Sequence, residues 1–370
     1  MVGGKIEARA HSEFLCLAHS GLDSRALRIQ ALHRLRQMMP IDAFWVATAD
    51  PATWLFTSAV KEAIPDTAVP CFVENEFLQD DVNKFRMLAA NHGTPVNSLY
   101  RATENRTETS RRFREILTPL GFGDELRAVF RTGGAVWGYA CMHCEGGTHG
   151  YTLQHLALLS RLAPLLAKGL RTALLLENAR RGDGAEQDDP GLVVLADDLS
   201  IAATTPAGER WLVEISDRTS RLPLPEAVHS VVARLWALER GETSEGAGRP
   251  LPQTRVRTAS GRWLVIHASR LSGPGTLGQT AVVLEPAPTS EVAPLLLDAY
   301  GLTRRERDVA QFVLRGMPTA AIAAALTISP LTVQQHLKAV FDKAGVCSRR
   351  GLIARVFAEQ YKPMLSGNAT

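Results

Sequence analysis

The stretch "ISPLTVQQHLKAVFDKAG" (Ile328–Gly345) predicts a short amphipathic helix. Ser329 is a good N-cap because its hydroxyl can accept a hydrogen bond from an N–H of the first turn, and Pro330 suits the first helical position. Apolar residues recur at i, i+4, i+7 and i+8 from Val333, which predicts one buried stripe. Gly345 can supply the left-handed residue that ends such a helix.

The outward face of this helix is polar and partly basic. Leu331, Gln334, Gln335, Lys338 and Asp342 are expected to point away from the buried stripe. On the helix alone, an ordinary solvated face explains this pattern as well as a binding surface does.

The flanking residues predict further short helices. Thr303 and Glu306 form a T-x-x-E capping box, and Gly316 can end the helix that follows it. A second short helix over residues 322–326 comes only a few residues before Ser329, and a fourth helix follows residue 348. Two helices in such tight succession predict a helix-turn-helix, whose second helix can enter the major groove of DNA.

Positive charge is concentrated in this part of the chain. Residues 300–362 contain ten Lys and Arg against four Asp and Glu, a net charge of +6, whereas the whole chain carries only +3. The remainder of the chain is therefore negative. The excess of positive charge lies where contacts to phosphates would need it.

The motifs "LTRRE", "IAAAL", "ISPLTVQQHL", "FDKAGV" and "SRR" resemble the LuxR-type (also called GerE-type) DNA-binding domain of bacterial regulators. The resemblance implies an all-α four-helix domain over residues 296–362, with a recognition helix over Pro330–Lys343. It also implies double-stranded DNA as a partner and a role as a cytoplasmic transcription regulator. Pseudo-palindromic operators match two-fold symmetric proteins, so we expect a homodimer.

The same resemblance assigns roles to individual residues. Base contacts would come mainly from Gln334, Gln335 and Lys338. The full DNA-binding set expected from the resemblance is Thr332, Gln334, Gln335, His336, Lys338 and Lys343. Within the domain, Glu306 is expected to pair with Arg349. The run "PTAA" (residues 318–321) departs from the family pattern, since it lacks the usual cap and basic residue.

The rest of the chain is long enough for two more domains. The polar stretch Arg180–Pro190 and the Pro-rich stretch Glu285–Pro294 are interpreted as linkers, which gives domains over residues 1–180, 190–286 and 296–362. No apolar run is long enough to cross a membrane, and the N-terminus lacks a secretory signal pattern. Five cysteines in 370 residues do not indicate a disulfide framework, which favours the cytoplasm.

The first two blocks are expected to be α+β domains with antiparallel sheets. In the first, the passage "PLGFGDELRAVF … VWGYACMH" resembles a GAF domain, a fold that senses small molecules. In the second, "GLVVLADDLSIAATTPAGERWL" and the later strands resemble a PAS domain. The whole chain is therefore predicted to combine a GAF-like sensor, a PAS-like domain and the LuxR-type domain. We expect a ligand or a partner at the N-terminal domains to control DNA binding.

A candidate ligand pocket can be proposed within the first block. Its residues are mostly aromatic: Trp45, Phe56, Phe72, Phe85, Phe130, Trp137 and Cys141. For each of these side chains, a place in the ordinary hydrophobic core is the competing interpretation.

The motif "CMHC" (residues 141–144) is the main chemical alternative. On a strand, Cys141 and Cys144 would point to opposite faces, so they could not share a metal or form a bridge. We therefore expect a structural role for both cysteines and no metal, with a thiol or metal switch, which could include Cys71, as the alternative. We also expect no cofactor and no enzyme activity. Two alternatives remain open: a GAF-type thiol enzyme, which needs a thiol of low pKa, and a protein-interaction platform with weak DNA binding, which needs an exposed apolar patch.

Overall fold

The computed structural model describes residues 2–91, 93–146, 150–179, 189–216, 222, 224–241, 251–276 and 278–358. Within these ranges the chain forms two compact units. The first, which extends to Pro286, contains two antiparallel sheets, and the second, from Ala287 onward, is helical. A multidomain chain with α+β structure first and an all-α end is thus confirmed.

The first sheet has five strands in the order β2-β1-β5-β4-β3. Its strands are β1 (Ala43–Ala49), β2 (Phe56–Glu62), β3 (Val96–Ser98), β4 (Phe122–Thr132) and β5 (Ala135–Glu145). Strands β1 and β2 pair antiparallel, and so do β4 and β5, so each pair forms a hairpin. Gly133 and Gly134, which join β4 to β5, have φ values of +62° and +82°, a conformation that favours glycine.

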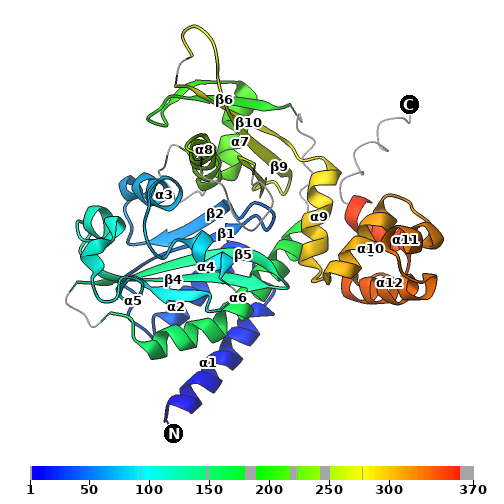
Figure 1. Ribbon diagram of the computed structural model, residues 1–370, viewed down its shortest axis with the longest axis horizontal. Helices are drawn as coiled ribbons and strands as arrows, with labels where there is room; N and C mark the ends of the chain where they lie inside the picture. Colours follow the sequence, from blue (N-terminus) through cyan, green and yellow to red (C-terminus); the bar gives the residue numbers. More distant parts are fainter. Residues whose placement is uncertain are drawn as a thin grey trace. The chain divides into compact units, whose positions relative to one another are not determined.

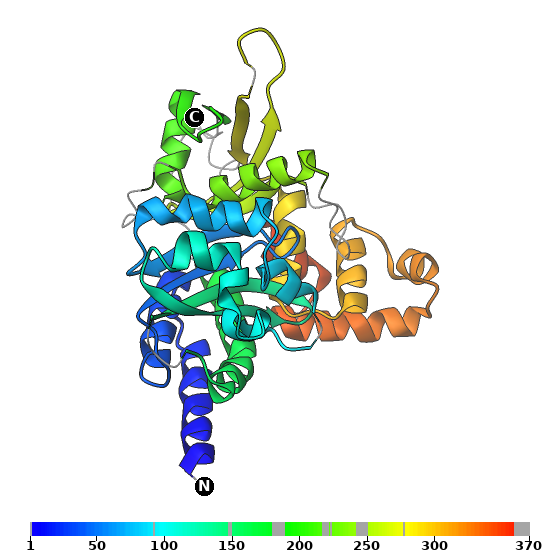
Figure 2. The same ribbon diagram turned by 60° about the vertical axis from the view of Figure 1, so that its left-hand side comes forward.

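Helices cover both faces of this sheet (Figures 1 and 2). One face packs against the long helix α6 (Leu153–Ala179) and α2 (Ser24–Leu35), and α1 (Val2–Ala18) packs on α6. The other face forms a core with α3 (Val69–Leu78) and α4 (Phe85–Ala90). The short elements of this unit are η1 (Asp66–Ala68), α5 (Leu99–Ala102), η2 (Thr107–Thr109) and the π-helical η3 (Phe113–Leu117).

Two stretches whose sequences predict helices fold differently. Residues 80–90 predict one helix, but it begins only at Phe85, and residues 107–121 predict another, but they form a 3-10 turn followed by the π-helical turn. Asp81 explains part of this difference. Its carboxylate accepts hydrogen bonds from the backbone N–H groups of Val82 and Arg112, so it ties two segments together instead of capping a helix.

The second sheet has five strands in the order β7-β6-β10-β9-β8, the same relative order as in the first. Its elements are β6 (Gly191–Leu195), β7 (Ile201–Thr204), α7 (Pro206–Ile215), α8 (Glu226–Glu239), β8 (Gln253–Arg257), β9 (Trp263–Arg270) and β10 (Thr280–Pro286). Helix α8, which was not expected, lies between the two sheets (Figure 1). It packs on β9 and also contacts α3 and β2, which explains why the two sheets share one unit.

Helix α8 contains a buried histidine whose titration should be measurable. His229 is 3% exposed, and among the described residues neither of its ring nitrogens has a hydrogen-bond partner. Burial lowers the pKa of His229 to about 4. The unfolded chain, with an ordinary histidine pKa of about 6.5, takes up this proton first. The contribution of the neutral His229 imidazole to the free energy of unfolding is therefore fully present above about pH 6.5. This contribution is lost as the pH falls toward 4.

We expect the stability of the His229→Leu variant to depend less on pH than that of the unchanged protein. Between pH 7 and pH 5 the histidine should account for a loss of about 2 kcal/mol in the free energy of unfolding. Urea unfolding at both pH values, for both proteins, measures the difference. Equal losses in the two proteins would show that the imidazole is hydrated or bonded in the folded state.

The two expected linkers have different outcomes. Most of the first, residues 180–188, lies outside the described residues. The second, Glu285–Pro294, contains the division between the two compact units after Pro286, but most of it has regular structure: it includes the end of β10 and the first half of α9 (Thr289–Ala299). Pro294 lies inside this helix, where it removes one backbone hydrogen bond. The buried apolar residues of α9, among them Leu296 and Leu297, outweigh that loss.

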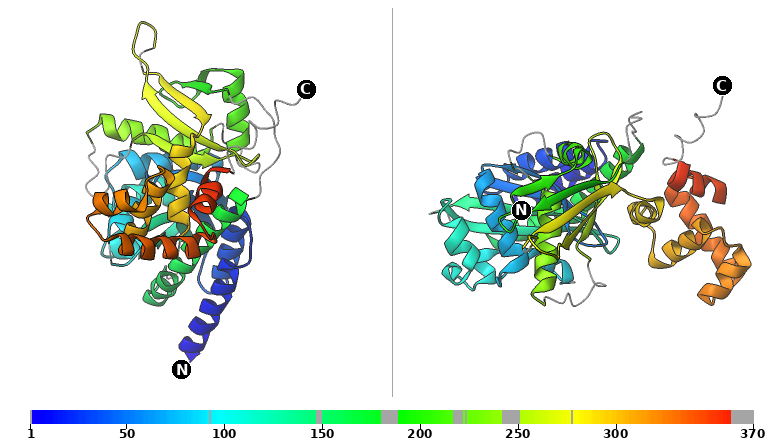
Figure 3. Two further views of the ribbon diagram at one scale, coloured as in Figure 1. Left: turned by 90° about the vertical axis from the view of Figure 1, so that its right-hand side faces the viewer. Right: turned by 90° about the horizontal axis from the view of Figure 1, so that it is seen from above.

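The second unit is a cluster of short helices (Figure 3, yellow-orange to red). After α9 come α10 (Arg304–Leu314), α11 (Thr319–Leu326), α12 (Pro330–Ala344), α13 (Arg349–Ile353) and the π-helical η4 (Ala354–Ala358). All of them contribute to one core that includes Val309, Ile322, Val333 and Leu352. No helix among the described residues is both long and apolar enough to span a bilayer.

Candidate functional site

Helix α12 has the cap, the first-turn proline and the glycine stop that its sequence predicts. The Ser329 hydroxyl accepts a hydrogen bond from the Thr332 N–H over 3.0 Å, and Pro330 occupies the first turn. Gly345 ends the helix with a φ of +65°. Val333 and Leu337 belong to the buried stripe, which also contains residues 340 and 344.

The helix-turn-helix geometry depends on the short connection before α12. Thr327 ends α11 in the left-handed conformation, with a φ of +55°. The Ile328 N–H then donates to the Ala323 carbonyl over 3.0 Å, which closes the turn. Helix α12 packs on both α10 and α11, and these contacts hold it in place.

The outer face of helix α12 carries three polar side chains. Gln334, Gln335 and Lys338 are exposed. In the described part of the chain, none of the three side chains makes a hydrogen bond or an ion pair. Spacings of one, three and four residues place them on one side of the helix. They are therefore available to bind another molecule.

The remaining residues of the expected DNA-binding set have different environments. Thr332 is half-buried, and its hydroxyl lies 2.8 Å from that of Ser329, so it supports the helix start. His336 is also half-buried. The Lys343 ammonium donates to a Glu306 carboxylate oxygen over 2.6 Å, a contact that ties the end of α12 to α10.

The expected pair between Glu306 and Arg349 is wrong. Glu306 binds Lys343, and it also closes the capping box by accepting the Thr303 N–H. Burial acts to raise the pKa of Glu306, but the hydrogen bonds from Lys343 and Thr303 outweigh it and lower the pKa. Arg349 instead donates to the Met317 carbonyl and the Thr319 hydroxyl, each over 2.8 Å.

The start of helix α11 explains why Arg349 does not bind Glu306. Thr319 lies at the start of α11, within the run that departs from the LuxR-type pattern, and Pro318 before it has no side chain that can cap. Arg349 reaches this helix start, and Lys343 in the last turn of α12 is then the cation left for Glu306.

A second candidate site is a small cavity inside the first unit, with a volume of about 30 Å³. Five of the seven side chains expected to form a ligand pocket line it: Trp45, Phe56, Phe72, Phe85 and Cys141. Phe130 and Trp137 are buried but belong neither to this lining nor to the core cluster around it. A space of this size holds one or two water molecules, so any larger ligand must displace side chains.

Charged side chains that the sequence interpretation missed also line this cavity. They are Glu76 on α3, Arg127 on β4 and Glu226 at the start of α8. Arg127 donates to Glu76 over 2.6 Å, and its guanidinium lies 4.5 Å from the centre of the Phe85 ring. Glu226 accepts the Trp45 indole N–H over 3.1 Å, and burial raises the pKa of Glu226.

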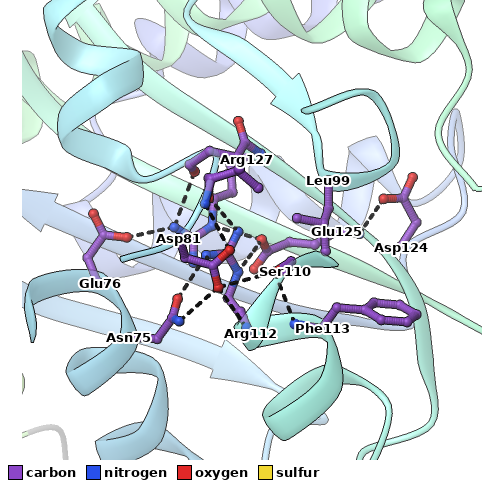
Figure 4. A network of polar contacts seen from close by, with 12 residues as sticks. Asn75, Glu76, Asp81, Leu99, Ser110, Arg112, Phe113, Asp124, Glu125 and Arg127 are labelled. Atoms are coloured by element: carbon purple, nitrogen blue, oxygen red, sulfur yellow. Dashed lines mark hydrogen bonds and ion pairs between the residues drawn. The ribbon is translucent and has the colours of Figure 1, made fainter. Parts of the chain in front are cut away.

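A buried polar network shares Glu76 and Arg127 with the cavity lining (Figure 4). Arg112 is fully buried and donates to the Glu125 carboxylate and to the Asn75 amide oxygen, each over 2.9 Å. Arg127 also approaches Glu125, with 2.9 Å between Nε and the carboxylate. Burial acts to raise the pKa of Glu125, but the two arginines outweigh it, so the pKa is lowered and the group is ionised.

The two cysteines of the "CMHC" motif are separate free thiols. Cys141 lines the cavity, whereas the Cys144 thiol lies 3.9 Å from the Asp124 carbonyl. Burial raises the pKa of the Cys141 thiol. A nucleophilic cysteine needs the opposite shift, so the structure does not favour a thiol enzyme.

A larger groove, about 890 Å³, lies in the same unit between α2, β2 and the residues around α7 and β8. It contains charged residues of both signs, including Arg25, Lys61, Asp66 and Glu214. Residues 217–221, next to its lining in the sequence, lie outside the described residues, and we assign no ligand to this groove.

The C-terminal unit can now be classified by comparison. Residues 301–356 match the family described as bacterial regulatory proteins, luxR family. These residues form a LuxR-type helix-turn-helix domain, as their resemblance predicted. A protein of Aeromonas salmonicida named as an HTH-type transcriptional regulator is 51% identical over 51 residues. That match spans 14% of this chain and 26% of the relative, so the chain covers about a quarter of the relative's length.

Two solved structures show weak likeness to this chain. Escherichia coli SdiA is 10% identical, with 95% of this chain and 97% of SdiA covered at a TM-score of 0.33. The phage VqmA–DPO complex is 17% identical, with 49% of this chain and 88% of that chain covered at a TM-score of 0.18. Neither value establishes a shared fold for the N-terminal unit.

Proposed function

We propose that the protein is a DNA-binding transcription regulator that reads the major groove with helix α12. The observation that carries this proposal is the set of Gln334, Gln335 and Lys338, exposed and unpaired among the described residues on a helix of a luxR-family domain. Glutamine can pair bidentately with the N6 and N7 edge of adenine, and lysine can reach guanine or a phosphate.

The charge of the domain supports this reading. Several arginines of the second unit are exposed, among them Arg304, Arg315, Arg350 and Arg355, which makes them available to phosphates. We propose a homodimer on DNA, because two copies would match a two-fold symmetric operator. A DNA target supports a cytoplasmic location, which we include in the proposal.

We further propose that the N-terminal unit controls DNA binding through a small-molecule ligand or a partner. Its two sheets share one strand order, which supports the interpretation of two sensor-type domains, one GAF-like and one PAS-like. The cavity beside Cys141 is the candidate ligand position in the GAF-like part. The raised pKa of the Cys141 thiol supports a non-enzymatic role.

Substitution of the glutamines tests the proposed readout. Gln334→Ala or Gln335→Ala should weaken binding by roughly 1–3 kcal/mol at one base position and relax discrimination there, because a bidentate contact is lost. Lys338→Ala should weaken binding to all sequences and reduce its salt dependence if Lys338 contacts a phosphate. Binding of the full-length protein to a randomised operator library, at several salt concentrations, measures both effects.

Gln311→Ala serves as the control, since this glutamine lies on α10 and not on α12. It should retain the base preference of the unchanged protein. If the Gln334 and Gln335 variants retain that preference at every position too, the two glutamines form only a solvated face and α12 is not the reading helix.

A further inference from the structure

Three side chains that can bind metals meet in the first sheet. Cys141 and His143 lie two residues apart on β5 and so share a face, and Glu125 lies directly opposite His143 on β4. The possible ligand atoms of the three all lie within 4.8 Å of one another. Glu125 and His143 are 0% exposed and Cys141 is 4% exposed. Strand pairing therefore fixes the spacing of a thiol, an imidazole and a carboxylate.

The polar atoms of this cluster lack partners. Among the described residues, neither ring nitrogen of His143 accepts or donates a hydrogen bond, and the Glu125 Oε1 atom has no partner. The other oxygen of Glu125 is held by Arg112 and approached by Arg127. Buried polar atoms in folded proteins are nearly always bonded, so three orphaned atoms on two adjoining side chains require an explanation.

We propose that Glu125, Cys141 and His143 bind one transition-metal ion of the zinc type. Sulfur, imidazole nitrogen and carboxylate oxygen are the atoms that Zn²⁺ takes in proteins. Zn²⁺ lies about 2.0–2.3 Å from such atoms, which places the ligands of a tetrahedral site about 3.5 Å apart. Because the ligand atoms lie within 4.8 Å of one another, a contraction of at most about one ångström reaches that spacing.

Charge balance supports a divalent ion. In the ion-free network, the carboxylates of Glu76, Asp81 and Glu125 exceed the guanidiniums of Arg112 and Arg127 by one negative charge. Binding M²⁺ to the Cys141 thiol releases one proton to solvent and leaves a thiolate, which adds one positive charge in total. The occupied network would then be neutral.

Aromatic rings hold the imidazole in place. His143 stacks on Phe122, with ring centres 4.8 Å apart, and the tilted ring of Phe72 lies beside it, with ring centres 5.7 Å apart. His143 is 0% exposed, so these neighbours keep its ring away from solvent. One nitrogen would bind the ion and the other would keep its proton.

The site would have an open position. Three protein ligands leave the fourth place of a tetrahedral ion to water or to a small molecule. Cys141 belongs both to this cluster and to the lining of the small cavity. An ion bound by Cys141 would therefore lie beside that cavity, and a molecule entering it could coordinate the ion.

Cobalt binding tests the proposal directly. Full-length protein is stripped with a chelator and titrated with Co²⁺ alone, in reducing buffer. We expect one equivalent to bind, with the visible absorption of a four-coordinate ion and a sulfur-to-cobalt charge-transfer band in the near ultraviolet. Zn²⁺ should displace it. His143→Ala should weaken Co²⁺ binding by at least about tenfold, the effect of losing even an outer partner of a metal ligand.

Cys144→Ser is the matched control for Cys141→Ser, because both residues are buried on the same strand. The charge-transfer band should persist in Cys144→Ser and vanish in Cys141→Ser. Its absence in the unchanged protein, or its persistence in Cys141→Ser, would overturn the assignment. X-ray absorption of the zinc-loaded unchanged protein needs no variant: one sulfur at about 2.3 Å supports the site, and no sulfur or several exclude it.

Discussion

Replacing Arg112 by methionine is expected to destabilise the first unit by about 3–5 kcal/mol. Arg112 is 0% exposed, and its guanidinium donates to Glu125, Asn75 and the Val82 carbonyl. Methionine fills much of the same volume but removes the guanidinium that now contacts the buried carboxylates of Glu125 and Asp81. A buried charge that loses its partner costs far more than an exposed one. Urea unfolding, followed by tryptophan fluorescence, measures the loss.

The neighbouring residue supplies the control. Arg111 forms an ion pair with Glu115 over 2.7 Å, but both side chains are about half exposed, so Arg111→Met should change stability little. A second variant tests the cause: Arg112→Met combined with Glu125→Leu restores the net charge of the network and should recover part of the loss. If Arg112→Met is as stable as Arg111→Met, the network is more hydrated than its burial indicates.

The helix-turn-helix could be predicted in detail because its signals are local. The T-x-x-E box at Thr303, the cap at Ser329 and the stop at Gly345 each act within one turn of a helix. The partner of Glu306 could not be predicted in this way. Lys343 and Arg349 are both basic and lie close in sequence, and only the packed helices decide between them.

The buried polar network around Glu125 and Arg127, in contrast, could not be predicted from local signals. Glu125 and Arg127 alternate with Leu126 and Ala128 along β4, a pattern that usually indicates a solvent-facing side of a strand. Helices α3 and α4 cover that side, and α3 brings Glu76 to pair with Arg127. Burial of these charges therefore depends on tertiary packing, which a period of two along one strand does not reveal.

The sequence carries a signal for helix α8, although the sequence interpretation does not include this helix. Val228, Val231, Val232 and Leu235 recur at i, i+3, i+4 and i+7. Because α8 lies between the sheets, the connection between the two expected domains depends on it, including the hydrogen bond from Ser230 on α8 to the Phe56 carbonyl on β2.

An ion pair between Asp50 and Arg255 also joins the two sheets. Asp50 follows β1, and its carboxylate accepts hydrogen bonds from the backbone N–H and the Nε of Arg255 on β8, over 3.0 and 2.9 Å. A second oxygen accepts from Nη2, so the pair is bidentate. Asp50 is 2% exposed and Arg255 is 6% exposed. Bidentate, buried geometry gives such a pair both strength and direction.

We expect Asp50→Ala to cost about 3–5 kcal/mol in the free energy of unfolding, because the Arg255 guanidinium stays buried after losing this carboxylate. Loss of the link should also let the second sheet open separately, so amide exchange in β8 and β9 should speed up more than in β4 and β5. Glu285→Gln is the control, since the Glu285–His267 pair is about 40% exposed and lies within the second sheet alone. Uniform acceleration in both sheets would mean that they unfold together even without the pair, and that α8 alone holds them in one unit.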